Sequence, residues 1–129
     1  MTAEQILDEL SQASGTEHYY QYVNIFNQKI FVYTDGIKNM AELCGAYWLI
    51  DCVASYQYGK VKQVPFQVWT LKKHVFKTGK RAGQWEWKLE ATDGNSIVMV
   101  WQTIEYSDFP LDSIKMYLSN GVLLLPSEY

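Results

Sequence analysis

Cysteine and histidine are scarce in this 129-residue sequence, which contains two of each. Cys44 and Cys52 fall on one predicted helix, about 12 Å apart along its axis, so they are too far apart to form a disulfide with each other. Their spacing matches no zinc-binding pattern, and the sequence has no HExxH, CxxC, phosphate-binding-loop or nucleophile-elbow motif. We therefore expect no bound metal ion and no cofactor, and these absences disfavour an enzyme.

Long hydrophobic runs are absent as well. No apolar stretch approaches the roughly 20 residues that a helix needs to cross a bilayer. The first ten residues, MTAEQILDEL, are acidic and lack the basic segment and the apolar stretch of a secretory signal. The sequence thus predicts a cytoplasmic protein with no membrane-spanning segment.

Hydrophobic residues nevertheless make up 48% of the chain, and aromatic residues make up 16%. This content argues against intrinsic disorder, and the chain is long enough to bury a hydrophobic core of its own. We expect residues 1–129 to form a single domain.

The longest predicted element is a helix from Thr34 to Tyr58. Thr34 or Asp35 would cap its start, and nearly all of its sides are apolar, which is typical of a buried helix. At 100° per residue, Asp51 falls on the face expected to pack into the core, and Ser55 follows one turn later. A buried carboxylate is costly unless it is paired. Asp51 is therefore expected either to line a functional pocket or to lock the packing by accepting hydrogen bonds from tyrosine hydroxyls, an indole or backbone amides.

Shorter elements precede and follow this helix. Residues 2–13 have the capping box and apolar stripe of an amphipathic helix, and residues 29–34 have the composition of a strand. Three further segments have the pattern of antiparallel strands: residues 66–75, 84–91 and 97–106. Residues 112–119 are expected to form a short helix and residues 122–129 a terminal edge strand. The predicted fold class is α+β, with the long helix packed on an antiparallel sheet of three main strands.

Residues 15–22, GTEHYYQY, contain a second set of candidate functional side chains. Glu17 would orient His18, whose imidazole titrates near neutral pH, as in a catalytic or ligand-binding site. The alternative is an ordered connector whose tyrosines bury their rings and hydrogen-bond their hydroxyls. One hypothesis is therefore a small enzyme or ligand-binding protein, with a pocket beside the central helix that uses Asp51, Ser55, His18 and Glu17.

The basic residues are concentrated in one part of the chain. Eight of the eleven lie between residues 60 and 88, where Glu86 is the only acidic residue, so this segment carries +7 and the rest carries −10. Mixtures of basic and aromatic residues can bind phosphates while stacking bases. We therefore predict a basic aromatic hairpin that binds an acidic protein surface or a nucleic acid. Its expected contact residues are Lys72, Lys73, Lys77, Lys80, Arg81, Trp69 and Trp85.

Two other interpretations of this hairpin remain open. In the first, the tryptophans belong to the core and the lysines are only solvated, so the hairpin binds no partner. Exposed aromatic residues would alternatively let the chain self-associate as a homodimer.

The chain resembles a known family over nearly its whole length apart from residues 76–83, and four strings carry the likeness: GTEHYY, YTDGIKNMAELCGAYWLIDCVASYQ, PFQVW and EYSDFPLDSIKMYLSNGVLLLPSEY. With these strings it resembles a family of small uncharacterised bacterial and phage proteins, a domain of unknown function. The resemblance implies no catalytic residue. It implies a prokaryotic cytosolic protein of the kind found on mobile elements, for which we expect a binding or regulatory role.

Overall fold

The computed structural model describes residues 1–129 and contains four α-helices and seven β-strands. In chain order these are α1 (Ala3–Ser11), β1 (Tyr19–Val23), β2 (Lys29–Thr34), α2 (Asp35–Cys44), α3 (Tyr47–Ser55), α4 (Gly59–Gln63), β3 (Phe66–Val75), β4 (Trp85–Thr92), β5 (Val98–Ile104), β6 (Ser113–Ser119) and β7 (Val122–Leu124). A short 3-10 helix, η1 (Pro126–Glu128), follows the last strand.

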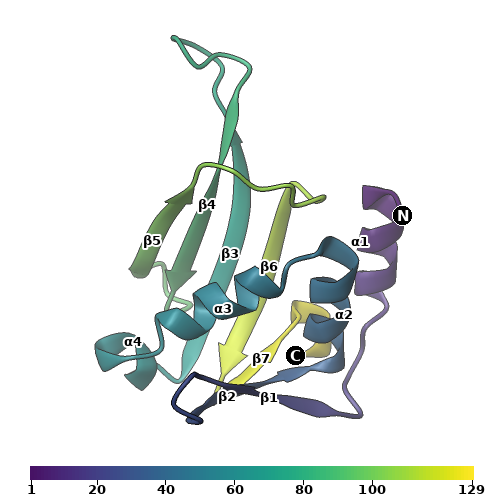
Figure 1. Ribbon diagram of the computed structural model, residues 1–129, viewed down its shortest axis with the longest axis vertical. Helices are drawn as coiled ribbons and strands as arrows, with labels where there is room; N and C mark the ends of the chain where they lie inside the picture. The colour runs from purple at the N-terminus through teal and green to yellow at the C-terminus, as the bar shows by residue number, and fades with distance from the viewer.

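All seven strands belong to one sheet, in the order β1-β2-β7-β6-β3-β4-β5 (Figure 1). Neighbouring strands are antiparallel except β2 and β7, which run parallel. The predicted α+β class is confirmed, and the three expected strands form one end of the sheet as β3, β4 and β5. The sheet is nevertheless mixed and has seven strands, so the prediction of an antiparallel sheet with three main strands was wrong.

The expected long helix is interrupted, so that prediction was wrong. α2 ends because Gly45 adopts the left-handed conformation (φ 60°, ψ 39°), and its N–H then donates to the carbonyl oxygen of Ala41. α3 starts after the buried Ala46 and runs in a different direction from α2 (Figure 1). The start of α2 was predicted correctly, because the Thr34 hydroxyl accepts a hydrogen bond from the N–H of Ile37 (3.3 Å).

Residues 113–119 form the strand β6 rather than a short helix. Their side chains alternate between the surface and the core, and Ile114, Met116 and Leu118 are the buried ones. An alternation of period two is the pattern of a strand with one face covered. β6 pairs with both β3 and β7, which places it in the interior of the sheet.

Two further strands also differ from expectation. β7 lies between β2 and β6, so residues 122–124 do not form an edge strand. Residues 19–23, which fall mainly in the expected connector, pair with β2 and form the edge strand β1. β1 pairs with β2, the next strand along the chain, whereas β7 pairs with β6 and with the distant β2.

The amphipathic first helix was predicted correctly. Thr2 and Gln5 form a reciprocal capping box, with hydrogen bonds of 3.2 Å to the Thr2 hydroxyl and 2.8 Å to the Gln5 side chain. Ile6 and Leu10 are buried, and α1 packs beside α2.

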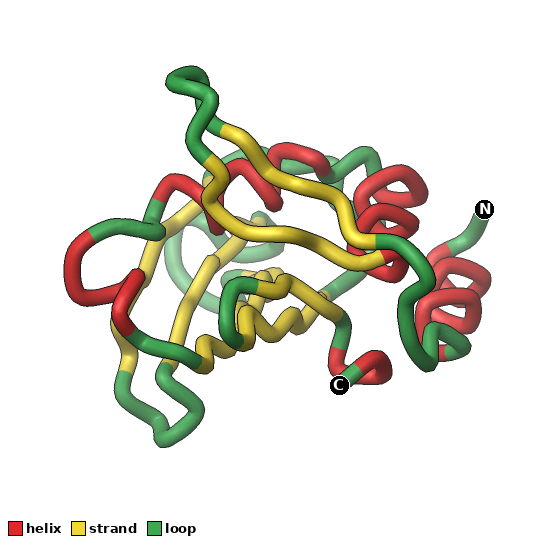
Figure 2. The backbone as a smooth tube through the Cα atoms, turned by 90° about the horizontal axis from the view of Figure 1, so that it is seen from below, coloured by secondary structure: helices red, strands yellow, loops and turns green.

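The sheet and the helices form two layers with one hydrophobic core between them (Figures 1 and 2). Fully buried side chains come from both layers: Ile37, Met40, Leu49, Ile50 and Val53 from the helices, and Trp69, Leu71, Trp87, Leu89 and Met116 from the strands. Alternate residues of β3, β4 and β6 point the other way and are exposed or half-buried. One face of this part of the sheet is therefore open to solvent. None of the helices combines the length and the apolarity that crossing a membrane requires.

Candidate functional site

β3 and β4 form a long hairpin that projects beyond the rest of the molecule (Figure 1). The connecting residues 76–84 are held by backbone hydrogen bonds, from Phe76 N to Gln84 O (2.9 Å) and from Gly83 N to Phe76 O (2.8 Å). Gly83 takes a left-handed conformation (φ 83°), which suits a residue without a side chain at this tight turn. The hairpin thus carries much of the basic segment away from the body of the protein.

Basic side chains of this hairpin stack on its aromatic rings. The Lys73 ammonium lies 4.4 Å from the centre of a Trp85 ring, and the Arg81 guanidinium lies 4.2 Å from the centre of the Phe76 ring. Such a contact stabilises the arrangement by about 0.5–1 kcal/mol at an exposed site. Arg81 also pairs with Glu86 at 3.4 Å, whereas Lys73 forms no ion pair. The Trp85 ring therefore holds the Lys73 ammonium in place while no acidic partner neutralises its charge.

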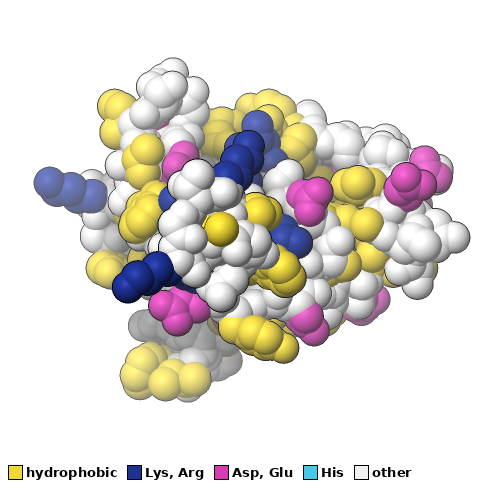
Figure 3. Space-filling model, turned by 90° about the horizontal axis from the view of Figure 1, so that it is seen from above, with side chains coloured by type: hydrophobic (Ala, Val, Ile, Leu, Met, Phe, Trp, Pro, Cys, Tyr) yellow, Lys and Arg dark blue, Asp and Glu magenta, His cyan; other side chains and the backbone are white.

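The open face of the sheet has a hollow of about 380 Å³ beside the hairpin. Its lining residues are Thr70, Lys72, Lys73, His74, Lys88, Glu90 and Trp101. The Lys88 ammonium lies 5.4 Å from the centre of the Trp101 ring, and 59% of Trp101 is exposed. Seen from the end where the hairpin projects, Lys and Arg side chains lie among hydrophobic ones (Figure 3). This hollow thus presents positive charge next to accessible aromatic surface.

A second hollow, of about 460 Å³, adjoins the first and shares Glu90 with it. Its lining residues are Phe66, Val68, Glu90, Thr92, Gly94, Ser96, Val98, Lys115 and Tyr117. The rings of Phe66 and Tyr117 lie 5.1 Å apart, and the Tyr129 ring packs on Tyr117 at 5.4 Å. We call the two hollows together the sheet-face groove. It runs across β5, β4, β3 and β6.

The predicted contact residues divide into two groups. Six of them are exposed or half-buried: Lys72, Lys73, Lys77, Lys80, Arg81 and Trp85. The inclusion of Trp69 was wrong, because its side chain is fully buried and its indole N–H donates to Gln67 Oε1 (2.9 Å). Trp101 and Lys115 were missed, although both line the groove. The alternation of residues 113–119 would have placed Lys115 on the exposed side of a strand.

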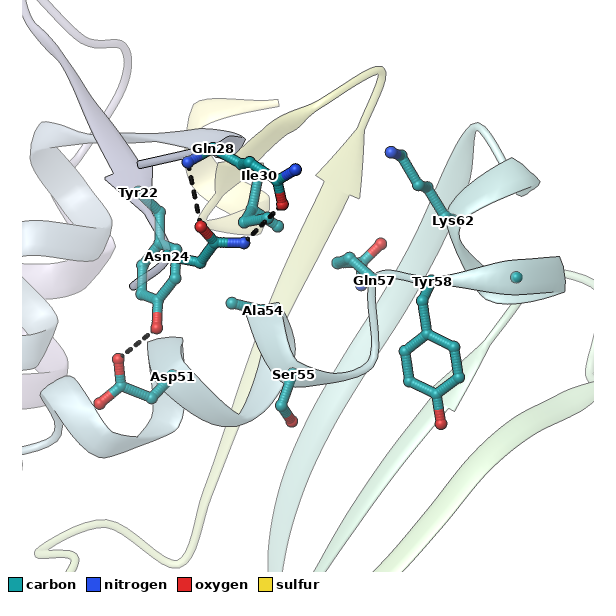
Figure 4. A pocket seen from close by; sticks show the side chains of 11 residues that line it. Tyr22, Asn24, Gln28, Ile30, Asp51, Ala54, Ser55, Gln57, Tyr58 and Lys62 are labelled. Atoms are coloured by element: carbon teal, nitrogen blue, oxygen red, sulfur yellow. Dashed lines mark hydrogen bonds between the residues drawn. The ribbon is translucent and has the colours of Figure 1, made fainter. Parts of the chain in front are cut away.

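Asp51 and Ser55 line a separate, open pocket of about 550 Å³ between α3, α4 and the β1–β2 hairpin (Figure 4). The other lining residues are Tyr22, Asn24, Gln28, Ile30, Ala54, Gln57, Tyr58, Gly59 and Lys62. The Asn24 and Gln28 amides hydrogen-bond to each other at 3.0 Å on one side, and Lys62 lies across from them (Figure 4). Carboxylate, amide and ammonium groups therefore face one cavity.

Asp51 is exposed, so its expected position in the core was wrong. Because α3 is not a continuation of α2, angles counted along a single helix do not apply to it. The Tyr22 hydroxyl donates to Asp51 Oδ1 (2.7 Å) and is one of the donors expected for this carboxylate. This hydrogen bond, with partial burial, raises the pKa of Tyr22 to about 12. The Ser55 hydroxyl donates to the Cys52 carbonyl oxygen (2.6 Å) within its own helix, so Ser55 does not assist Asp51.

His18 and Glu17 do not line this pocket, and the expected grouping with Asp51 was wrong. The backbone N–H groups of Glu17 and His18 donate to Asp35 Oδ2 at 2.9 and 3.2 Å, and the Tyr20 hydroxyl donates to Asp35 Oδ1 at 2.9 Å. Hydrogen bonds from Glu17 and Tyr20 lower the pKa of Asp35 to about 2. The cluster ties the connector before β1 to the start of α2, which is a structural role.

The cysteines take no part in any of these sites. Cys44 and Cys52 are both free, and burial raises the pKa of the Cys44 thiol to about 11. A thiol with a raised pKa is a poor nucleophile because little of it is ionised near neutral pH. No group of three or more His, Cys, Asp and Glu residues is arranged to hold a metal ion.

Comparison with known proteins identifies a family but no activity. The family model of DUF6876, described as a family of unknown function, matches residues 4–129, which include all seven strands. No curated protein and no solved structure matches the chain. The chain therefore belongs to the DUF6876 family of unknown function, in agreement with the resemblance seen in its sequence.

Proposed function

We propose that this protein is a non-enzymatic binding or regulatory module that uses its basic aromatic hairpin to contact an anionic macromolecule, either an acidic protein surface or a nucleic acid. The observation that carries the proposal is the hollow beside the hairpin. There, lysines without ion-pair partners and an exposed tryptophan line one cavity on the open face of the sheet.

The charge distribution supports this proposal despite the net charge of −3. Exposed charges more than about 8 Å apart are largely screened at physiological ionic strength, so local charge governs docking. Residues 60–88 carry +7, and the acidic helix α1 packs beside α2 rather than on the hairpin. A partner that approaches the hairpin therefore meets a positive surface.

Heparin chromatography tests this proposal, with heparin as the polyanion probe. We expect the wild type to bind at 0.1 M NaCl and the Lys72→Glu/Lys88→Glu variant to elute in the flow-through. Both lysines are on the groove, and reversing them removes the charges that attract the polyanion. An unretained wild-type protein would contradict the proposal.

A matched control separates local charge from net charge. Lys29→Glu/Lys38→Glu changes the net charge by the same amount at two positions outside residues 60–88 and outside the groove. We expect this control to be retained nearly as well as the wild type. If it loses retention as fully as the groove variant, the hairpin is not the binding site.

The Asp51 pocket favours a second candidate function, which is that of a small enzyme or ligand-binding protein. Asp51 and Lys62 place opposite charges on one cavity of about 550 Å³, which suits a ligand with both a cationic and an anionic group, such as an amino acid. NMR titration with an amino-acid panel would test this. We expect shifts around Asp51 that disappear in Asp51→Asn and persist in the control Asp8→Asn, which lies on α1. A panel that leaves the pocket signals unchanged would exclude this candidate.

We further propose a bacterial or phage origin, from the sequence resemblance, and a place of action in the cytosol. The two free cysteines support the cytosol, because thiols stay reduced there. Fractionation of cells that carry the gene would test the compartment, and recovery in a secreted fraction would contradict it.

A further inference from the structure

We infer that the sheet-face groove binds single-stranded nucleic acid, with one base stacked on Trp101 and contacted by Glu90. This inference rests on the proposed function and names the partner of the same surface. It follows from the order in which aromatic, basic and acidic side chains occur across the sheet.

Trp101 provides the first stacking surface. It lies on the edge strand β5, directly opposite Glu90, and 59% of it is exposed. An exposed aromatic ring on a sheet can stack on any unpaired base, and each such contact strengthens binding roughly 5- to 140-fold. Bases inside a duplex are already stacked on each other. The ring therefore selects single strands over double strands.

A second aromatic surface lies at the other side of the groove. The strand register places one row of residues across the sheet: Trp101, Glu90, Thr70 and Lys115. Because neighbouring strands lie about 4.8 Å apart, this row spans about 14 Å. Tyr117, which packs with Phe66 and Tyr129, is two residues beyond Lys115 on β6. A strand of a few nucleotides can thus contact aromatic surface at both ends of the groove.

Lysines occupy the positions that phosphates would reach. Lys72 and Lys88 are directly paired across β3 and β4, and Lys115 lies on the adjacent strand β6. None of the three forms an ion pair, although Glu86 and Glu90 are on the same strand as Lys88. Each phosphate contact to a single strand changes the slope of log affinity against log salt by about −0.7, so three lysines give a slope of about −2.

Glu90 distinguishes a nucleic acid from an acidic protein. It lies between the two hollows and forms no hydrogen bond or ion pair. An ionised carboxylate only accepts hydrogen bonds, and the carboxylates of an acidic peptide have no donor to offer it. It can, however, accept from the exocyclic amino group of a base stacked on Trp101, as glutamate does with the N4 amino group of cytosine. Thymine has no amino group, so cytosine is favoured over thymine.

Fluorescence anisotropy with labelled oligonucleotides tests the inference. The probes are the ten-nucleotide strands dC10 and dT10 and a ten-base-pair duplex, each at 50 and 200 mM NaCl. We expect dC10 to bind at least threefold more tightly than dT10, and the duplex to bind at least tenfold more weakly than either. We also expect a salt slope near −2 and quenching of tryptophan fluorescence when dC10 binds.

Variants assign these effects to individual side chains. Trp101→Ala should weaken dC10 binding at least fivefold, and Trp101→Phe should restore most of it because a stacking ring remains. Glu90→Gln should reduce the preference for dC10 over dT10. The control Tyr58→Ala removes an aromatic side chain on the helical side that is at least as exposed as Trp101, and it should leave dC10 binding unchanged. Circular dichroism of each variant verifies that it is folded.

The outcomes separate this inference from the proposed function. If heparin retention depends on Lys72 and Lys88 but Trp101→Ala binds dC10 normally, the single-strand inference is overturned and the proposed function stands. Polyglutamate that displaces dC10 at equal concentration of charge would identify an acidic protein as the partner and also overturn the inference. If neither heparin nor any oligonucleotide binds, both proposals fail.

Discussion

Gly36→Ala should show how strongly residues after β7 are fastened to the start of α2. A Cβ atom at Gly36 would lie 2.5 Å from Cδ of Glu128, so it would overlap the carboxylate. This carboxylate accepts hydrogen bonds from the Thr34 hydroxyl (2.7 Å), the Gly36 N–H (3.2 Å) and the Leu125 N–H (2.9 Å). It also lies at the N-terminus of α2, where negative charge is favourable. The added methyl group must therefore displace Glu128 from these donors.

The expected magnitude follows from the bonds that are lost. Hydrogen bonds to a charged group contribute about 1.5–3 kcal/mol each, and Glu128 is only half-buried, so losing those from Thr34 and Gly36 should cost about 2–3 kcal/mol together. Alanine regains up to about 1 kcal/mol because it forms helix better than glycine. We expect a net decrease of about 1–2 kcal/mol in the free energy of unfolding. For a domain of this size, that lowers the Tm by about 4–8 °C.

Urea unfolding followed by circular dichroism would measure this, in the wild type and in the Glu128→Ala background. Without the carboxylate the methyl group has room, so Gly36→Ala should stabilise the Glu128→Ala protein by up to about 1 kcal/mol. The predicted effect thus changes sign between the two backgrounds. Equal destabilisation in both would refute the reasoning.

Three other predictions concern single positions. The pKa of Tyr22 is raised from 10.0 to about 12, so the free energy of unfolding should fall as pH rises through that range. In Tyr22→Phe this fall with pH should be smaller, and urea unfolding at several pH values measures it in both proteins. The pKa of Asp35 is lowered from 3.8 to about 2, so stability should fall as pH drops through that range. Asp35→Asn should be less stable at pH 7 and lack this acid slope, and an unchanged acid-unfolding curve would contradict it. Gly45→Ala should cost about 1–2 kcal/mol in thermal unfolding because φ is positive there, and Gly45→Asn should cost less.

The β3–β4 hairpin and β2 could be predicted from sequence because local patterns specify them. Residues 66–75 and 85–92 have the composition and alternation of strands, and a glycine-containing loop joins them. The Thr2–Gln5 capping box likewise marks the start of α1 through side chains three residues apart. Each of these elements is specified within its own segment.

The errors arose where the outcome depends on distant residues. Gly45 was compatible with a polar sector in one long helix, and only the folded structure shows that its left-handed conformation ends α2. Residues 113–119 alternate with period two, but the Asn120–Gly121 turn after them resembles a helix end as much as a strand turn. Pairing with β3 and β7 decides in favour of a strand.

The candidate site was predictable only in part, for a related reason. The lysines of the hairpin could be identified because a cluster of basic residues is visible in the sequence without knowledge of the fold. Whether Trp69 or Trp101 faces solvent depends on which face of the sheet the helices cover, and that follows from the tertiary structure. Asp51 was expected in the core because its position was counted along one long helix. It lies at the surface because α3 is a separate helix.

The parallel pairing of β2 with β7 has a consequence for synthesis on the ribosome. β1 and β2 join the rest of the sheet only through β7, whose residues follow those of β2 by roughly 90 positions. At about 5–20 residues per second, the β1–β2 hairpin waits about 5–18 s with one edge unpaired. Such an edge can pair with strands of other nascent chains. β2 can therefore join the rest of the sheet only after residues 122–124 have been synthesised, so a contact of high sequence separation completes the sheet.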